Sequence, residues 1–567
     1  MPTPDAAAEA TKAAEMFAAH EETLAKATQA IRTREYFSAY NESPSPRVYG
    51  ESAAADGKAA FEAYAGTTFP LDTPGAEGTV ATEKSPFGFA LDVAYPRVTP
   101  AGVDALMAAA SAGIKAFRDA GPDARVGVCI EILHRLHGRV FELANAVQHT
   151  SGQAFVMAFQ AGGAHALDRA LEAIAYSHVE MSRTPRTAVW EKPGKGDPLR
   201  MEKTFTAVPR GVALVIGCNT FPTWNSWPGL FASLACGNPV VVKPHPGAVL
   251  PLAITVQVAQ EVLAEAGFDP HLVTLAAEDP ADGLAKTLAV RPEVRLVDFT
   301  GSNAFGDWLE DNARQATVFT EKAGVNTVVV DSTDTFKGMC FNLAFSFALY
   351  TGQMCTAPQN VYLPADGIET DEGHKSVADV AAGIEAAFGK LLGDDARAVE
   401  LLGGVVNDGV LSRLDAAGSA GKVLVESRVV RHPAYDDAVV RTPTLIGLTA
   451  EDGDVYESEC FGPVAYLIET SGTDQSIELF RRTVTEHGAM TAAVYSTSDN
   501  VVAAMRDAAL DAGVALSENL TGQVFVNQSA AYSDFHGTGA NPAANASYTD
   551  GAYVASRFRI VQSRRHI

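Results

Sequence analysis

From residue 212 onward, short apolar runs alternate with longer segments of helical spacing, and this alternation limits the fold more than any other feature of the chain. Runs that are apolar at every position are buried on both faces, as in a parallel sheet covered by helices. The first four strands are expected at VALVI (212–216), NPVVV (238–242), LVTLA (272–276) and RLVDF (295–299). Strands alternating with helices form βαβ units, so the sequence predicts an α/β fold with a parallel sheet.

A second α/β pattern follows the first and continues to about residue 530. Its strands are expected at TVVV (327–330), NVYL (360–363), AVYS (493–496) and QVFVN (523–527). Ahead of both patterns, residues 6–40 and 100–182 have helical spacing. In residues 185–211, alternating polar and apolar residues flank the turn sequence PGKGDP, which predicts a hairpin. We expect this hairpin to protrude and to pair with another subunit.

Composition excludes several classes of function. The chain has 567 residues, too many for one core, so two or three domains are expected. Its net charge of −25 argues against binding to nucleic acid or to an anionic membrane. The six cysteines form no C-x-x-C pair, so neither a structural zinc site nor a disulfide framework is expected, and no metal is predicted. The sequence has no signal-peptide pattern and no apolar run of about 20 residues, so a cytoplasmic protein is expected.

Cys355 is the leading candidate for a reactive group. It lies in GQMCTAPQN (352–360), among small and polar residues that follow an apolar helical run ending near Tyr350. Gly352 fits the end of that helix. A thiol at such a turn can be exposed, and helix ends and neighbouring dipoles can lower its pKa toward the reactive thiolate. The alternative is a small buried side chain with no chemical role.

Polar groups also follow three of the predicted strands, at the edge where an open parallel sheet binds ligands. Asn219 follows the first of these strands and Lys243 the second. Thr300, Gly301 and Ser302 lead from the fourth strand into a helix, whose free N–H groups suit a phosphate. Each has a simpler alternative, either a solvated lysine or an ordinary helix cap. The G-x-G-x-x-G fingerprint of a standard dinucleotide site is absent from this stretch.

Two carboxylates complete the candidate site. Glu321 stands among apolar and small residues, where partial burial would raise its pKa toward that of a general base. The alternative is a surface charge near a domain boundary. Glu459 lies in ESECFGPV (457–464), three residues before Gly462, and its alternative is an ordinary loop carboxylate.

Together these motifs resemble the aldehyde dehydrogenase superfamily over roughly residues 90–540. FTGSNAFG (299–306) resembles the cofactor turn of that family, GQMCTAPQN its nucleophile motif and ESECFGPV its E-x-F-G-P-V motif. CNTFP and VVVKP resemble its asparagine and Lys-Pro motifs. The separation of 34 residues (355 − 321) between Glu321 and Cys355 matches the base-to-nucleophile spacing of the family.

The resemblance implies a role for each residue. Cys355 would be the nucleophile, Glu321 the base that activates water, and Asn219 the amide that binds the oxyanion together with the Cys355 backbone N–H. The residues that would contact the NAD(P) cofactor are Lys243, His245, Gly301, Ser302, Gly306, Glu459 and Phe461.

The resemblance also implies three parts of the chain. An N-terminal helical region and a Rossmann-type NAD(P)-binding domain would span residues 1–184 and 207–320. The α/β catalytic domain would span residues 321–540. A small β element for oligomerisation, residues 185–206 and 541–567, would make a homodimer or homotetramer.

Some segments depart from the general family pattern. The family's Glu-Leu-Gly-Gly-Lys is here EKAGV (321–325), and Cys218 and Thr220 alter the asparagine motif. The segments EKPGKGDPLRMEKTF, CNTFPTWNSWPG and the C-terminal DFHGTGANPAANASYTDGAYVASRFRIVQSRRH are similar to a group of phenylacetic acid degradation proteins, PaaN. Members of that group resemble dehydrogenases of CoA-bound semialdehydes, so a CoA-linked aldehyde is the expected substrate.

The predicted reaction is the NAD(P)-dependent oxidation of an aldehyde to a carboxylic acid. Family members that use NAD usually carry a Glu three residues after the motif lysine, where this chain has Pro246, so NADP is the expected cofactor and NAD the alternative. Two other classes stay open. One is an acyltransferase or thioester hydrolase that uses Cys355 without a redox cofactor, and the other is a catalytically silent scaffold.

Overall fold

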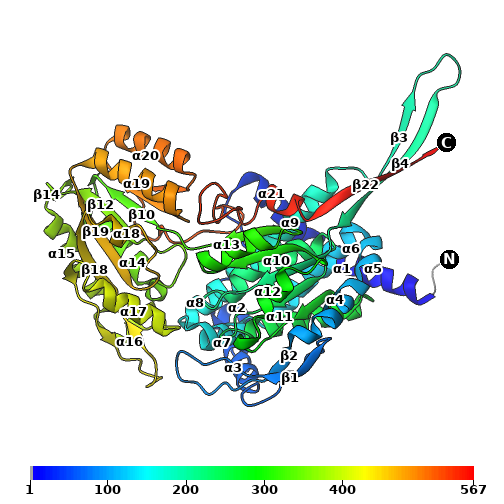
Figure 1. Ribbon diagram of the computed structural model, residues 1–567, viewed down its shortest axis with the longest axis horizontal. Helices are drawn as coiled ribbons and strands as arrows, with labels where there is room; N and C mark the ends of the chain where they lie inside the picture. The colour runs from blue at the N-terminus through cyan, green and yellow to red at the C-terminus, as the bar shows by residue number, and fades with distance from the viewer. Residues whose placement is uncertain (1–3) are drawn as a thin grey trace.

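Five parallel strands form the sheet of the first lobe, in the order β7–β6–β5–β8–β9. The computed structural model describes residues 4–567, and this lobe holds most of the N-terminal half (Figure 1). The strands are Val212–Ile216 (β5), Val240–Lys243 (β6), Val273–Leu275 (β7), Val294–Thr300 (β8) and Thr317–Glu321 (β9). The first four are those predicted from the sequence, and the fifth ends on Glu321.

Alternate residues of these strands enter two separate cores, which explains why most of their positions are apolar. Val215 and Val242 pack against α6, α9, α10 and α11, whereas Leu214 and Val241 face α4, α12 and α13. The helices of this lobe are α4 (Val103–Ala112), α5 (Ile114–Asp119), α6 (Gly121–Gly138), α7 (Val140–Ser151), α8 (Phe155–Phe159), α9 (His165–Ser182), α10 (Pro222–Ala235), α11 (Leu250–Glu265), α12 (Leu284–Ala289) and α13 (Asn303–Asn312). A π-helical turn, Gln160–Ala164, joins α8 to α9.

The N-terminal segment wraps the first lobe. Helix α1 (Pro4–Thr33) lies against α6 and α9, and it ends before residue 40 because Arg34 takes a left-handed φ of 58°. The remaining elements of this segment are α2 (Pro46–Tyr49), α3 (Ala53–Glu62), β1 (Ala76–Val80) and β2 (Tyr95–Val98). Within residues 4–567, no helix combines the length and the apolar character needed to cross a membrane.

The second lobe is built on a seven-stranded sheet in the order β15–β18–β19–β12–β10–β20–β21, parallel except at the β15 edge. Helices α14 and α15 cover one face, and α17, α19 and α20 cover the other (Figure 1). The strands are β10 (Thr327–Val330), β12 (Asn360–Pro364), β15 (Lys422–Val425), β18 (Thr444–Thr449), β19 (Val464–Thr470), β20 (Ala492–Tyr495) and β21 (Leu516–Glu518). The helices are α14 (Phe336–Ala348), α15 (Val377–Leu392), α17 (Asp408–Ala417), α19 (Thr473–His487) and α20 (Asp499–Ala512). The chain thus forms a mixed α/β fold with two parallel sheets, as predicted.

One predicted strand of this lobe is wrong. Residues 523–527 form turns rather than a strand. Their apolar side chains are explained by packing: the Phe525 ring stacks on that of Phe345 in α14, 3.7 Å between centroids, and Val526 joins the core beside α14.

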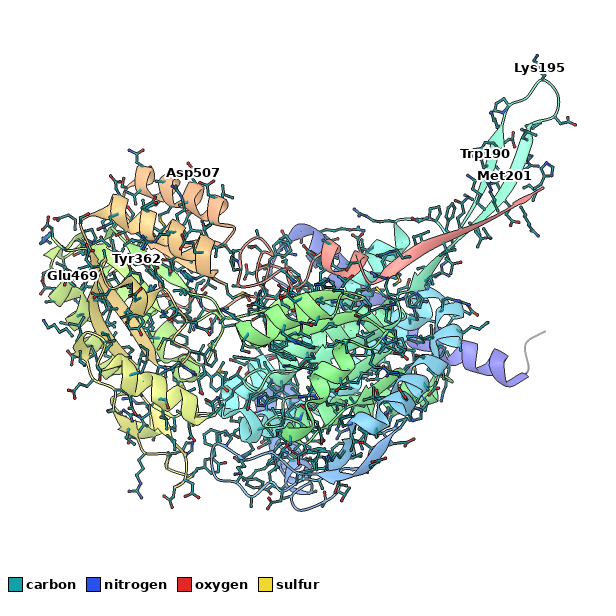
Figure 2. The ribbon with its side chains drawn as sticks, in the orientation of Figure 1. Trp190, Lys195, Met201, Tyr362, Glu469 and Asp507 are labelled. Carbon is teal, nitrogen blue, oxygen red and sulfur yellow. The ribbon has the colours of Figure 1, made fainter. Side chains whose placement is uncertain are left out.

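A three-stranded antiparallel arm projects from the first lobe (Figure 1). It contains β3 (Thr187–Lys192), β4 (Leu199–Pro209) and β22 (Phe558–His566), so the predicted hairpin is confirmed. Trp190, Lys195 and Met201 mark the two strands and the tip of the hairpin in Figure 2. β22 pairs with β4 from Phe558 opposite Pro209 to His566 opposite Met201.

Candidate active site

The turn that follows α14 carries Cys355 into the space between the lobes. Tyr350, Thr351 and Gly352 all take left-handed φ values, of 53°, 56° and 65°. A side chain at Gly352 would overlap the carbonyl oxygen of Gly462, so this position needs glycine. The Thr351 hydroxyl donates to the Gly403 carbonyl oxygen at 2.8 Å and fixes the turn. The sequence placed the end of this helix correctly to within a turn.

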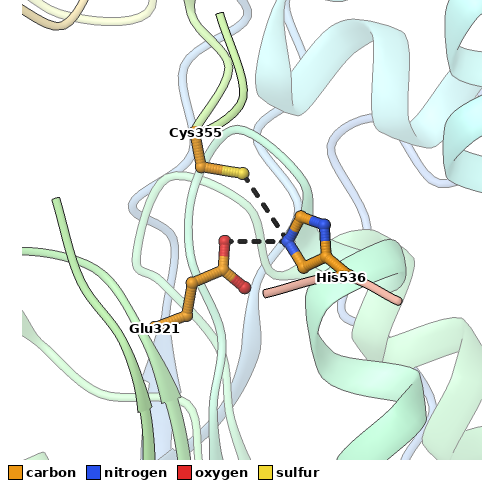
Figure 3. A group of neighbouring side chains, drawn as sticks. All are labelled: Glu321, Cys355 and His536. Carbon is orange, nitrogen blue, oxygen red and sulfur yellow. Dashed lines mark hydrogen bonds and ion pairs between the residues drawn. The ribbon is translucent and has the colours of Figure 1, made fainter. Parts of the chain in front are cut away.

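Three reactive side chains meet at this point (Figure 3). The Cys355 Sγ lies 3.8 Å from Nε2 of His536, and the same nitrogen lies 3.1 Å from Oε1 of Glu321. Glu321 comes from the carboxyl end of β9, and His536 comes from a C-terminal loop that bridges to Tyr548 through two backbone hydrogen bonds of 2.9 Å. The structure therefore brings the predicted nucleophile and base together and adds an imidazole that the sequence analysis missed.

The surroundings shift the pKa values of Cys355 and Glu321 in opposite directions. Burial raises the pKa of the Cys355 thiol well above its usual value, and the nearby Glu321 carboxylate raises it further. Burial alone would also raise the pKa of Glu321, but the His536 ring, the Cys355 thiol and the Asn225 amide together hold it below the usual value. The site therefore stores its negative charge on the carboxylate, while sulfur keeps its proton.

Free hydrogen-bonding atoms remain around the thiol. Glu321 is 1% exposed, and among the described residues its Oε1 has no aligned hydrogen-bond donor. The backbone N–H of Cys355 likewise donates to no protein acceptor within residues 4–567. A buried acceptor and a free donor beside one sulfur are the groups that a water molecule and a substrate oxygen would need.

The amide at this site belongs to Asn225 rather than to Asn219. Asn225, in the first turns of α10, donates through Nδ2 to Oε2 of Glu321 at 3.1 Å, and its Oδ1 lies 3.6 Å from the Cys218 Sγ. Asn219 lies outside this cluster, because its Nδ2 donates instead to the Thr150 carbonyl oxygen at 3.0 Å. α10 begins at Pro222, so the loop with the extra Thr220 turns Asn219 away from the thiol.

A cavity of about 570 Å³ opens onto this cluster. Cys355, Asn225 and His536 line it, while Glu321 stands behind them. The indole of Trp224 packs edge-on against the His536 ring, with centroids 4.5 Å apart, and holds the imidazole in place. The turn at 523–527 forms another wall.

Lys243 lies at the carboxyl end of β6 and is almost fully buried, as is its ion-pair partner Glu278. The second oxygen of Glu278 accepts the backbone N–H of Leu284 at 2.6 Å. His245 does not offer a positive charge here, because its Nδ1 accepts the Gly247 backbone N–H at 3.0 Å and so is unprotonated. Of the two predicted cofactor contacts Lys243 and His245, only the lysine carries a positive charge, and Glu278 pairs with it.

The predicted phosphate turn leads from β8 into α13. Ser302 is the N-cap of α13 but its side chain accepts no cap hydrogen bond, so first-turn N–H groups remain free for a phosphate. The Gly301 N–H donates to the Glu321 carbonyl oxygen at 3.0 Å. A side chain at Gly306 would meet the Lys322 stem, which packs over this helix. These residues fit the diphosphate of a dinucleotide.

Glu459 and Phe461 lie on the catalytic-lobe side, in the loop before β19. Burial raises the pKa of the Glu459 carboxyl to about 7. The Phe461 carbonyl oxygen accepts Nε of Arg413 at 2.7 Å, which ties this loop to α17. Glu459 is close enough to Cys355 to raise the pKa of its thiol slightly, so the loop borders the catalytic cluster.

Comparison with known proteins explains this arrangement. The model of the aldehyde dehydrogenase family matches residues 77–538. The chain belongs to the aldehyde dehydrogenase family. A crystal structure of an NAD-dependent aldehyde dehydrogenase from Burkholderia multivorans is 58% identical, covers 97% of this chain and 99% of its own, and superposes with a TM-score of 0.95.

More distant relatives of this aldehyde dehydrogenase family member include 1-pyrroline-5-carboxylate dehydrogenase from Bacillus cereus strain B4264, 24% identical over 315 residues. That match spans 53% of this chain and 58% of the relative, so the chain covers somewhat more than half the length of the curated relatives it matches. A 1-pyrroline-5-carboxylate dehydrogenase from Thermus with bound NAD, 19% identical, covers 94% of this chain and 99% of its own with a TM-score of 0.73, and shares the fold.

His536, Asn225 and Glu278 were not predicted from the sequence. A single histidine in a Gly-rich loop has no spacing signal that links it to a cysteine 181 residues away. Asn225 lies in the segment CNTFPTWNSWPG together with Asn219. Which of the two asparagines faces the thiol depends on where α10 begins, and the sequence alone does not show this. Glu278 follows β7, the neighbour of β6, so the rule that ligands bind beyond the strand ends could have found it.

Cys355, Glu321 and His536 are also residue types that bind zinc, and their ligand atoms lie within 4.8 Å of one another. The expectation that the protein needs no metal stays a prediction.

Proposed function

We propose that this protein oxidises an aldehyde to a carboxylic acid, with NAD as the hydride acceptor and Cys355 as the covalent nucleophile. The cluster of Cys355, Glu321 and His536 at the wall of one cavity is the observation that carries this proposal. Family membership supports it, as does the high identity to a protein named as an NAD-dependent aldehyde dehydrogenase.

The first step needs a thiolate, and the free thiol is protonated. The Cys355 proton passes to Nε2 of His536, 3.8 Å away. Sulfur then bonds to the carbonyl carbon, and the carbonyl electron pair moves onto oxygen. This oxyanion would be held by the Cys355 backbone N–H and by the second N–H of the Asn225 amide.

The nicotinamide cofactor supplies the acceptor for the hydride that leaves this carbon, and the product on the enzyme is a thioester of Cys355. Lys243, Ser302 and the first turn of α13 would hold the cofactor, with Glu459 and Phe461 toward its nicotinamide end. Glu321 then takes a proton from water, whose oxygen attacks the thioester carbon. The C–S bond breaks, sulfur regains its proton from His536, Glu321 releases the water proton to solvent, and the carboxylic acid leaves.

For the cofactor we propose NAD over NADP, contrary to the sequence expectation. That expectation rested on Pro246, which removes the family's carboxylate beside the ribose. Glu278, in the segment that follows β7, supplies a carboxylate instead, in contact with Lys243. A buried carboxylate at the ribose would repel a 2′-phosphate and accept a hydrogen bond from a 2′-hydroxyl.

Calorimetric titration of the protein with each cofactor tests this choice without relying on catalysis. NAD should bind more tightly than NADP. Glu278→Gln should reduce the ratio of the two affinities by roughly tenfold, because it removes the repulsion between the Glu278 carboxylate and the 2′-phosphate of NADP. Glu486→Gln, which removes an exposed carboxylate on α19, is the matched control and should change neither affinity. Tighter binding of NADP to the wild type would contradict the proposal.

The reaction itself is tested by mixing protein, NAD and benzaldehyde and following both the reduced cofactor and benzoic acid. We expect the two products in equal amounts. Release of acid from a thioester without NAD, and no cofactor reduction with any aldehyde, would instead indicate the cysteine hydrolase or acyltransferase considered from the sequence.

We also propose that the arm pairs with a second copy of this chain to make a dimer or tetramer. Val189, Leu199 and Val561 are more than half exposed on this arm, whose outer strands β3 and β22 each leave one edge unpaired within residues 4–567. Light scattering on the intact protein and on a variant with Val189 and Val561 changed to lysine tests this, and a monomeric wild type would contradict it.

A further inference from the structure

We infer that the substrate is an uncharged aldehyde with an aromatic or long aliphatic body, and that aldehydes bearing a carboxylate or a phosphate are poor substrates. This inference rests on the proposed function and names its substrate class. It follows from the charges of the cavity that opens onto Cys355. It also reverses the CoA-linked substrate expected from the sequence.

No lysine or arginine is found among the described residues that line this cavity. Its ionisable lining residues, apart from Cys355, are Tyr36, Glu42, His165, Asp168, Glu400, Asp534 and His536. Four of these are carboxyl groups. An anion entering the cavity would therefore lose water without gaining a positive partner, which is costly.

The two histidines do not supply the missing positive charge. Nε2 of His165 lies 2.6 Å from Glu42, and His536 contacts Glu321 as described above. Each imidazole is thus already beside a carboxylate. Protonation of either one would neutralise that carboxylate and leave no free cation for a substrate.

The arginines packed behind the wall are also committed to other groups. Arg169, which is 1% exposed, contacts Glu172 at 2.9 Å and donates to the Asp534 carbonyl oxygen at 2.9 Å. Arg34 lies 3.7 Å from the same Glu172 and stacks over the Phe535 ring at 3.9 Å. Two cations sharing one fully buried carboxylate stabilise the wall rather than face the cavity.

Apart from these ionisable groups, the lining combines apolar and aromatic side chains with uncharged polar ones, which are Ser38, Gln160, Asn225, Thr356, Gln523, Asn527, Gln528 and Ser529. Rings of Phe37, Phe221, Trp224, Phe345 and Phe525 line the cavity, together with methionine and leucine side chains. A volume of about 570 Å³ lies within the range of sites for small organic ligands. Flat apolar walls favour an aromatic ring or an alkyl chain over a polar tail.

Matched pairs of aldehydes test the inference. kcat/KM with NAD is measured for benzaldehyde against 4-carboxybenzaldehyde, for hexanal against succinic semialdehyde, and for a CoA-linked semialdehyde. The uncharged member of each pair should be used at least about tenfold better, a selectivity equal to one uncompensated charge contact. Equal or better use of the anionic aldehydes, or of the CoA-linked one, would overturn the inference.

These outcomes are distinct from failure of the proposed function, in which no aldehyde reduces the cofactor. Binding gives a second readout: calorimetry on Cys355→Ala should detect benzaldehyde more readily than 4-carboxybenzaldehyde.

A charge reversal tests whether the lining of the cavity causes the selectivity against anionic aldehydes. Glu400→Lys should raise kcat/KM for 4-carboxybenzaldehyde relative to benzaldehyde by roughly twofold to fivefold, as for an exposed ion pair. Asp507→Lys changes the net charge equally but lies on α20, outside the cavity lining (Figure 2), and should leave the ratio unchanged. An unchanged ratio in Glu400→Lys, or an equal change in both variants, would overturn the inference.

Discussion

Two buried pairs, Lys243–Glu278 and His536–Glu321, look alike in burial and differ in what surrounds them. All four side chains are less than 9% exposed, and each carboxylate contacts one nitrogen base. In the lysine pair, the second oxygen of Glu278 accepts the Leu284 N–H. In the histidine pair, Nε2 of His536 also lies next to the Cys355 thiol. Burial alone therefore does not mark a catalytic carboxylate. A neighbouring group that can exchange a proton distinguishes the reactive pair from the binding pair.

Removing the Cys355 sulfur should have the largest effect on activity, because the thiol is the proton-exchanging group that only the His536–Glu321 pair has beside it. Cys355→Ala should lower aldehyde oxidation by at least about a thousandfold, since no thioester can form. The change in cofactor absorbance measures this. Cys460→Ala, at a partly exposed cysteine in the Glu459 loop, is the control and should keep most activity. A Cys355→Ala variant that is as active as the control would show that the nucleophile is elsewhere.

Changing one carboxylate in each pair separates their roles directly. Glu321→Gln should reduce steady-state turnover by about 100-fold or more, because water is no longer activated, while the first turnover persists as a burst of reduced cofactor. Glu278→Gln should keep turnover at saturating NAD and change cofactor affinity instead. Rapid-mixing kinetics shows both effects. Normal turnover in Glu321→Gln, or loss of the chemical step in Glu278→Gln, would contradict the comparison.

The two asparagines provide a test of similar design. Asn225→Ala should lower kcat by about 100-fold, because it removes an oxyanion donor and frees the Glu321 side chain. Asn219→Ala, which removes a hydrogen bond to the Thr150 carbonyl, should cost less than about tenfold. kcat and circular dichroism are measured together, so that unfolding is recognised. The reverse order would restore Asn219 to the role expected from the sequence.

The smallest expected effect is on thiol reactivity in the free protein. The pKa of Cys355 is raised by burial and by Glu321, so its alkylation by iodoacetamide should be slow at pH 7 and rise steadily with pH toward 9 and above. Glu321→Gln removes the nearby negative charge, lowers the pKa of the thiol and should speed alkylation at pH 8 by a few-fold to about tenfold. A slower reaction in this variant would show that the carboxylate activates the thiol rather than suppressing it.

The sequence predicted the sheets better than the contacts within the site. Apolar runs such as 212–216 and 327–330 record burial on both faces, so their strands could be identified without the structure. Residues 523–527 failed because an apolar segment packed on α14 has the same pattern as a strand. Cys355 and Glu321 could be found because a motif and a spacing connect them. His536 and Glu278 could not, since their partners are joined only by the folded chain.

In the proposed reaction, Cys355 carries the acyl group and Glu321 is needed to release it. The most direct test is mass spectrometry of Glu321→Gln after brief mixing with NAD and benzaldehyde and quenching in acid. We expect a benzoyl group on the peptide that contains Cys355, in an amount equal to the reduced cofactor formed. Reduced cofactor without acylation of Cys355, or a benzoyl group on another residue, would contradict it.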